Sequence, residues 1–182
     1  MLFRSTNCMN PDDSVLDEGK PMSDAAMPIH GRIAFHDALR AAFAEAASAG
    51  CAQIWLCDPD FADWPLGERS VIESLSAWVA SQRRLTLIAG DFDPIVRRHP
   101  RWVAWRRAWA HVVDCRSNPE IEPNALPTIM VASGLLSLRL VERVHHRGLL
   151  ERGPRAAQIG FDTIDAVLQR SVDAFPATTA GL

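Results

Sequence analysis

Two patterns of apolar residues alternate along most of this chain. Short apolar runs bounded by Gly, Pro or Asp predict buried strands, and longer stretches with apolar positions three or four residues apart predict helices. The predicted strands cover residues 52–57, 85–89, 111–115, 128–132, 135–141 and 156–160. The predicted helices cover residues 33–49, 68–80, 101–110 and 161–172, with a short additional helix that ends at His99.

The order of these elements predicts the fold class. Strands and helices alternate in the first half, which favours parallel strands joined by crossover helices. Later in the chain, two apolar runs flank Ser133 and Gly134, a pattern typical of an antiparallel hairpin. We therefore predict an α/β fold in which a mixed β-sheet carries helices on both faces.

The first 28 residues differ in composition from the rest. Residues 1–28 hold three prolines and five acidic residues against Arg4 and Lys20, without apolar periodicity. This composition predicts a disordered acidic tail, followed by a single α/β domain over residues 29–182. Met22 or Met27 is an alternative start to Met1. The tail also accounts for the net charge of −3, which leaves the domain neutral.

Composition excludes several classes of function. The 182 residues contain no apolar run long enough for a bilayer and no secretory signal at the start, so we expect a cytoplasmic protein without a membrane partner. We also expect that nucleic acid is an unlikely partner, because general nucleic-acid binding depends on basic residues that neutralise phosphates and the domain has no net charge. No Cys or His pair has zinc-ligand spacing, and we predict neither a metal nor a cofactor.

Acidic residues follow two of the predicted strands. Asp58, Asp60 and Asp63 come after the first strand, and Asp91 and Asp93 come after the second. If these strands are parallel neighbours, the five carboxylates gather at the carboxyl edge of the sheet, where open α/β folds bind ligands. They are candidate ligand-binding residues and could hold Mg²⁺. The alternative is that they serve turns and helix caps.

One family would give the first loop a catalytic role. An apolar strand followed by Asp58-x-Asp60 resembles the opening motif of haloacid-dehalogenase-like phosphatases, in which the first Asp is the nucleophile and the second the acid/base. That family also uses a basic residue, normally Lys, for the phosphate, and the only lysine here, Lys20, lies in the predicted tail. The two acidic loops nevertheless leave an alternative function, which is a metal-dependent phosphoryl-transfer enzyme or phosphatase using the Asp58/Asp60 and Asp91/Asp93 loops.

Arginines and tryptophans are concentrated between residues 97 and 109. The tryptophans have the spacing of one helix face: Trp102, Trp105 and Trp109. This spacing favours a core role over a surface that grips phosphates and stacks bases. Arg107 points away from the tryptophans, and Arg106, near the edge of the apolar face, could stack on an indole. Arg97 and Arg98 are further candidates for binding a ligand.

Three segments resemble those of a proteobacterial protein family to which no activity is assigned. They are residues 58–68, 99–107 and 175–182. The element order also resembles one half of a phospholipase D-like domain. Such enzymes carry His-x-Lys-x-x-x-x-Asp-Gly on a late strand, where the His attacks phosphorus and the Lys holds the phosphate oxygens.

The stretch of this chain that matches the phospholipase D motif keeps only its glycine, Gly134. Leu126, Thr128 and Ser133 stand where the resemblance requires His, Lys and Asp. The resemblance therefore implies a fold without the nucleophile and without the phosphate clamp. We expect a non-catalytic binding or interaction module, and a homodimer, because active relatives pair two half-domains.

Overall fold

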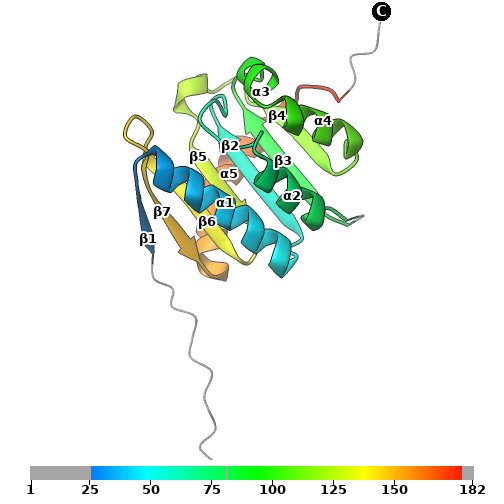
Figure 1. The fold of residues 1–182 in the computed structure, drawn as a ribbon. Helices are drawn as coiled ribbons and strands as arrows, with labels where there is room; N and C mark the ends of the chain where they lie inside the picture. Colours follow the sequence, from blue (N-terminus) through cyan, green and yellow to red (C-terminus); the bar gives the residue numbers. More distant parts are fainter. Residues whose placement is uncertain (1–25, 81, 178–182) are drawn as a thin grey trace, which may run out of the picture.

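The computed structural model describes residues 26–80 and 82–177, which form one layered α/β unit (Figure 1). Eight strands make up its sheet: β1 (Met27–His30), β2 (Gln53–Asp58), β3 (Arg84–Ala89), β4 (Val113–Ser117), β5 (Thr128–Ala132), β6 (Leu136–Glu142), β7 (Arg147–Arg152) and β8 (Val172–Asp173). The helices are α1 (Arg32–Ala49), α2 (Arg69–Trp78), α3 (Asp93–Arg98), α4 (Pro100–Ala108) and α5 (Pro154–Leu168), with a 3₁₀ turn at Pro123–Ala125.

The sheet is mixed, as the sequence predicts. Its strand order is β1-β7-β6-β5-β2-β3-β4-β8. Strands β2, β3 and β4 are parallel neighbours, because α2 and the α3–α4 pair cross over between them. The remaining pairs are antiparallel, including the predicted β5–β6 hairpin, whose turn contains Gly134 at φ 70°. Only glycine adopts this left-handed conformation without a steric penalty.

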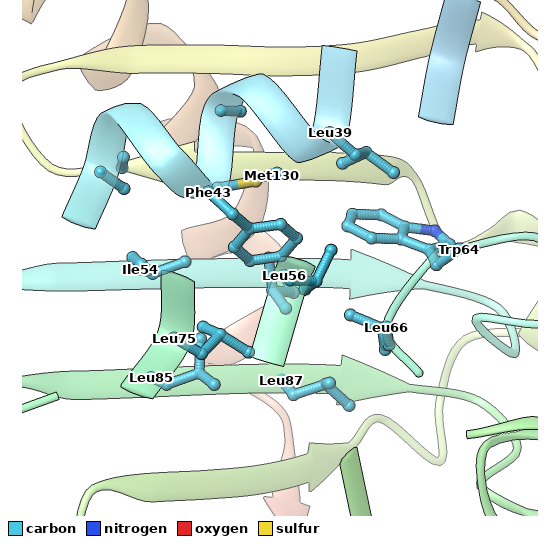
Figure 2. Packing of buried hydrophobic residues seen from close by; sticks show 14 of the residues in the cluster. Leu39, Phe43, Ile54, Leu56, Trp64, Leu66, Leu75, Leu85, Leu87 and Met130 are labelled. Carbon is cyan, nitrogen blue, oxygen red and sulfur yellow. The ribbon is translucent and has the colours of Figure 1, made fainter. Parts of the chain in front are cut away.

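Helices cover both faces of the sheet, which confirms the predicted fold class. Helices α1 to α4 lie on one face, and α5 lies on the other (Figure 1). On the first face, Phe43 of α1 and Leu75 of α2 pack against Leu56 and Leu87 (Figure 2). In the part of the chain that the structure describes, no helix combines the length and apolar character that a membrane crossing requires.

The C-terminal assignment from sequence is wrong. Residues 156–160 are helical rather than a strand, and the strand lies earlier, as β7. The helix begins at Pro154, directly after Gly153, and proline is favoured at the first helical position. Its buried residues then recur with helical spacing: Ala157, Gly160, Ile164 and Val167.

The N-terminal edge of the sheet is a second difference from the prediction. Met27 and Pro28, assigned above to the tail, belong to β1, which pairs with β7. Ile29, in the same strand, is buried and belongs to the main core. The rest of the predicted tail lies outside the described residues.

Candidate functional site

The carboxyl ends of β2 and β3 meet at one edge of the sheet, as predicted for parallel neighbours. Asp58 pairs with Ala89 in the register of the two strands. Two further segments reach this edge: the start of α1 and the turn between β6 and β7, which are joined by a hydrogen bond from the Gly31 N–H to the His146 carbonyl at 3.1 Å. The edge therefore combines residues from distant parts of the chain.

Asp58 is buried at this edge, with 2% of its surface exposed. Its Oδ1 accepts hydrogen bonds from the backbone N–H groups of Asp60 at 3.0 Å and Phe61 at 2.7 Å. Its Oδ2 accepts a hydrogen bond from the Thr128 hydroxyl at 2.6 Å. These bonds hold Phe61 at φ 56°, a conformation that a bulky residue rarely adopts. Asp58 is thus occupied by the turn that it stabilises.

The other carboxylates of this loop lie near basic side chains. The Oδ1 of Asp60 accepts the Ala62 N–H at 2.9 Å and lies 3.6 Å from Arg143 Nη2, which is also 3.8 Å from Asp58 Oδ1. Asp63 Oδ1 lies 3.7 Å from Arg32 Nη2, and its Oδ2 lies 3.8 Å from His146 Nε2. These separations are those of ion pairs without direct hydrogen bonds. The edge is therefore a charge-compensated cluster.

Asp91 and Asp93 do not join this cluster as a metal site. The two loops touch through their backbones, since Pro59 accepts N–H bonds from Gly90 and Asp91 at 3.0 Å. However, Asp91 Oδ1 accepts the Asp93 N–H at 2.9 Å, and Asp93 begins α3. Over residues 26–80 and 82–177, no three Asp, Glu, His or Cys side chains are grouped so that they could hold a metal ion. The loops converge, but Asp58, Asp60 and Asp91 each accept backbone N–H groups of their own turns.

The positions that match the phospholipase D motif lie on and beside β5. Leu126, in the nucleophile's place, is 3% exposed and packs in the core beneath α5. Thr128, in the lysine's place, is also 3% exposed, and its hydroxyl donates to Asp58. Ser133, in the aspartate's place, accepts the Gln53 N–H at 3.1 Å. All three side chains have structural roles.

Arg97 and Arg98 end α3 and are exposed. Arg98 Nη1 donates to the Ala62 carbonyl at 3.1 Å, and Arg101 Nη1 donates to the Gly67 carbonyl at 3.5 Å. Arg98 and Arg32 line an open depression of about 290 Å³ between α1, the β2–α2 loop and the α3–α4 junction. We call Arg32, Arg98 and Arg101 the arginine rim.

The floor of this depression contains a buried tryptophan and a buried histidine. Trp64 is 2% exposed, and in the part of the chain that the structure describes its indole N–H has no hydrogen-bond partner. Figure 2 shows that nitrogen at the end of the ring that points away from Phe43. His99 Nδ1 accepts the Gly67 N–H at 3.2 Å, so its Nε2–H donates to the Phe61 carbonyl at 2.9 Å. Burial lowers the pKa of His99, which favours this neutral form.

The sequence did not predict the contacts that several residues make at this edge: Arg32, Thr128, Arg143, His146, and His99 with the backbones of Gly67 and Phe61. Arg143 and His146 belong to the turn between β6 and β7, and only the register of that hairpin brings them to Asp60 and Asp63. A correctly placed β7 would have predicted the turn, although not its contact with the acidic loop.

The helix with tryptophans follows the predicted core pattern, with one exception. Trp102 is 0% exposed, Trp105 is 7% exposed, and Trp109 is half-buried. Arg106, predicted at the edge of the apolar face, is buried instead. Its guanidinium lies over the ring of Phe175 at 4.6 Å, so it stacks on a residue of the C-terminal segment and not on an indole.

Comparisons with known proteins support the fold alone. No protein-family model matches the chain, and no curated protein matches it. Among solved structures it is similar to the archaeal chromatin protein TrmBL2, described as showing a novel mode of DNA binding, with a TM-score of 0.59 and 9% identity over 87% of this chain; the chain spans 57% of that protein.

Two further solved structures cover nearly the whole of the protein compared. NucT from Helicobacter pylori matches 82% of this chain and 99% of its own, with a TM-score of 0.52 and 7% identity. Nuc from Salmonella typhimurium, a phospholipase D family member, matches 82% and 97%, with a TM-score of 0.51 and 8% identity. The chain therefore has a phospholipase D-like fold.

One of the predictions about partners is wrong. The neutral charge of the domain predicts that nucleic acid is an unlikely partner, yet a protein with a similar fold is a DNA-binding chromatin protein. Net charge is the wrong criterion, because the local field of a surface attracts phosphates. Four arginines are exposed on α3 and α4: Arg97, Arg98, Arg101 and Arg107.

Proposed function

We propose that this chain is a non-catalytic binding module built on a phospholipase D-like fold. The observation that carries the proposal is the burial of Leu126 and Thr128 at the positions of the nucleophile and the phosphate clamp. A leucine side chain has no nucleophilic atom, and the Thr128 hydroxyl already donates to Asp58. Phosphodiester cleavage by the mechanism of the family therefore has no residue to begin it.

A metal-dependent phosphoryl-transfer enzyme has less support. Both oxygens of Asp58 accept hydrogen bonds, and one oxygen each of Asp60 and Asp91 accepts a backbone N–H group, so few carboxylate oxygens are left for Mg²⁺. Magnesium demands near-octahedral oxygen ligation and usually uses one or two free carboxylates. The charge of Asp60 is also met by Arg143.

The partner that we propose is nucleic acid, bound at the arginine rim. Arg32 and Arg98 line the depression at the carboxyl edge, Arg101 contacts the Gly67 carbonyl in its wall, and such guanidinium groups bind phosphate oxygens with paired hydrogen bonds. Half or more of the hydrogen bonds in protein–DNA complexes go to phosphate and sugar, so a rim of this kind is a positioning surface. The DNA-binding protein of similar fold adds support.

Catalysis is tested with bis(nitrophenyl) phosphate, in EDTA and then in Mg²⁺ or Mn²⁺. We expect no turnover that scales with protein concentration. The matched variants are Thr128→Val, which keeps the shape of the side chain, and Asp60→Asn. Turnover that either variant abolishes would contradict the proposal.

Binding is tested by fluorescence anisotropy with labelled single-stranded and double-stranded oligonucleotides at two salt concentrations. Each phosphate contact contributes about 0.9 to the slope of log affinity against log salt for duplex DNA. The double variant Arg98→Gln/Arg101→Gln should weaken binding and lower that slope. The control Arg155→Gln/Arg170→Gln removes two exposed charges beside α5 and should leave both unchanged. Equal losses in both variants, or no binding at low salt, would refute nucleic acid as the partner.

A further inference from the structure

A recess lies between α4 and the segment that follows β8. We call it the Arg106 recess; it has a volume of about 190 Å³ and is lined by Val103, Arg106, Arg107, Phe175, Pro176 and Ala177. In Figure 1 the segment after β8, coloured red, passes beside α3 and α4. Phe175 holds this segment in place by stacking on Phe92, with ring centroids 5.1 Å apart. The recess shares no lining residue with the depression at the arginine rim.

Arg106 is a buried cation in this recess, with 4% of its surface exposed. Its Nη2 donates to the Phe175 carbonyl, and its guanidinium carbon lies 4.6 Å from the centroid of the Phe175 ring. Its Nε is buried and has no hydrogen-bond partner among residues 26–80 and 82–177. A guanidinium has five N–H groups in a planar fork, and a buried N–H without a partner is a donor that is normally satisfied.

Within the described residues, Arg106 has no carboxylate at ion-pair distance, although several less buried arginines do. Cys115 is a titratable neighbour, but burial raises the pKa of its thiol to about 11, so the thiol is neutral at pH 7. The carbonyl of Phe175 and its ring supply only partial negative charge. Buried charges are normally paired, and among the residues that the structure describes this one lacks a full counter-charge.

We propose that the Arg106 recess binds an oxyanion, the phosphate or carboxylate group of a ligand, with Arg106 as the buried cation and Arg107 at the entrance. The recess is several times larger than the volume of about 30 Å³ that one water occupies in the liquid. Arginine pairs with both kinds of oxyanion through two parallel N–H bonds, and such bonds are stronger in a partly buried site than in water. The site is independent of the nucleic-acid partner proposed above.

The test is a thermal-shift titration of the full chain with inorganic phosphate, with acetate in a second arm, and with chloride at matched ionic strength. An ion that binds only the native state raises Tm in a saturable manner. Phosphate also stabilises proteins in general by exclusion from their surface, and that effect does not saturate. We expect a saturable shift in the wild type. Saturation by phosphate alone assigns the site to phosphate groups, and saturation by acetate as well assigns it to oxyanions generally.

The variants separate the recess from the rest of the surface. Arg107→Gln should weaken the apparent affinity several-fold, and Arg106→Gln should remove the saturable shift. Arg155→Gln, an exposed arginine on α5, is the matched control and should behave as the wild type. A saturable shift of equal size in all four proteins, or none in the wild type, would overturn the proposal.

One variant keeps the test decisive if Arg106→Gln does not fold. Val103 lines the recess and precedes Arg106 by three residues and Arg107 by four, so Val103→Glu places a carboxylate beside both on the same helix face. This internal carboxylate should raise Tm without added ion and abolish the response to phosphate. An unchanged phosphate response in Val103→Glu would count against the recess as the binding site.

Discussion

Replacing Trp102 by alanine should destabilise the protein by roughly 3–5 kcal/mol, the usual cost of deleting a large buried aromatic side chain. Trp102 is 0% exposed and belongs to the main core, together with Trp78 and Leu75 of α2. Among the described residues its buried indole N–H has no partner, and removing an unsatisfied buried donor offsets about 1 kcal/mol of the lost free energy of unfolding. We therefore expect the lower end of the range, about 3 kcal/mol.

In a domain of this size, 1 kcal/mol corresponds to about 2–4 °C in Tm, so Trp102→Ala should melt roughly 6–12 °C below the wild type. Circular dichroism melting at one scan rate measures this shift. Arg107→Ala, an exposed position on the same helix, is the control and should change stability by no more than about 0.5 kcal/mol. Trp102→Phe keeps a buried aromatic ring, so its Tm should lie between those of Trp102→Ala and Arg107→Ala. Equal melting of Trp102→Ala and Arg107→Ala would refute the core role of this helix face.

Three further predictions concern other buried groups. Asp58→Ala should cost roughly 3 kcal/mol in urea unfolding, because it leaves buried donors on Phe61 and Thr128 unpaired, whereas exposed Asp91→Ala should cost about 1 kcal/mol or less. Because the pKa of His99 is lowered in the folded protein, the unfolded chain binds the proton more tightly. The contribution of His99 to stability is therefore full above the ordinary histidine pKa of about 6.5 and falls as the pH drops below it. Tm measured from pH 8 to pH 5 should fall less in His99→Gln than in the wild type. Cys115 in a chain whose other cysteines are replaced (Cys8→Ser, Cys51→Ser and Cys57→Ala) should not react with Ellman's reagent at pH 8 until denaturant is added, because burial raises its pKa to about 11; rapid reaction of the native protein would show that the site opens.

Local patterns predicted the elements whose partners are close in sequence. Helix α1, strands β2 and β3, and the β5–β6 hairpin all lie within a residue or two of their predicted bounds. Strand β1 was missed because it is four residues long and pairs with β7, more than 100 residues later. The run Ala156–Gly160 was misread because a short apolar segment does not distinguish a strand from a helix, and the Gly153-Pro154 start signal was overlooked.

The candidate site divides in the same way. The meeting of the two acidic loops follows from parallel pairing and was predicted. The direction in which each carboxylate points was not predicted, because Asp side chains in turns accept hydrogen bonds from nearby backbone N–H groups, as Asp58 and Asp91 do. The burial of Arg106 depends on Phe175, which lies nearly 70 residues away and has no periodic signal of its own.

The two ends of the sheet restrict how copies of this chain can associate. One outer strand, β1, has four residues and includes Pro28, which has no N–H to offer a neighbouring strand. The other outer strand, β8, has two residues, too few for a ladder. Short edges and edge prolines prevent sheets from joining edge to edge into continuous assemblies. A dimer of this chain would therefore be built through helix surfaces or loops, and its interface would be sought by substitutions there and not along the outer strands.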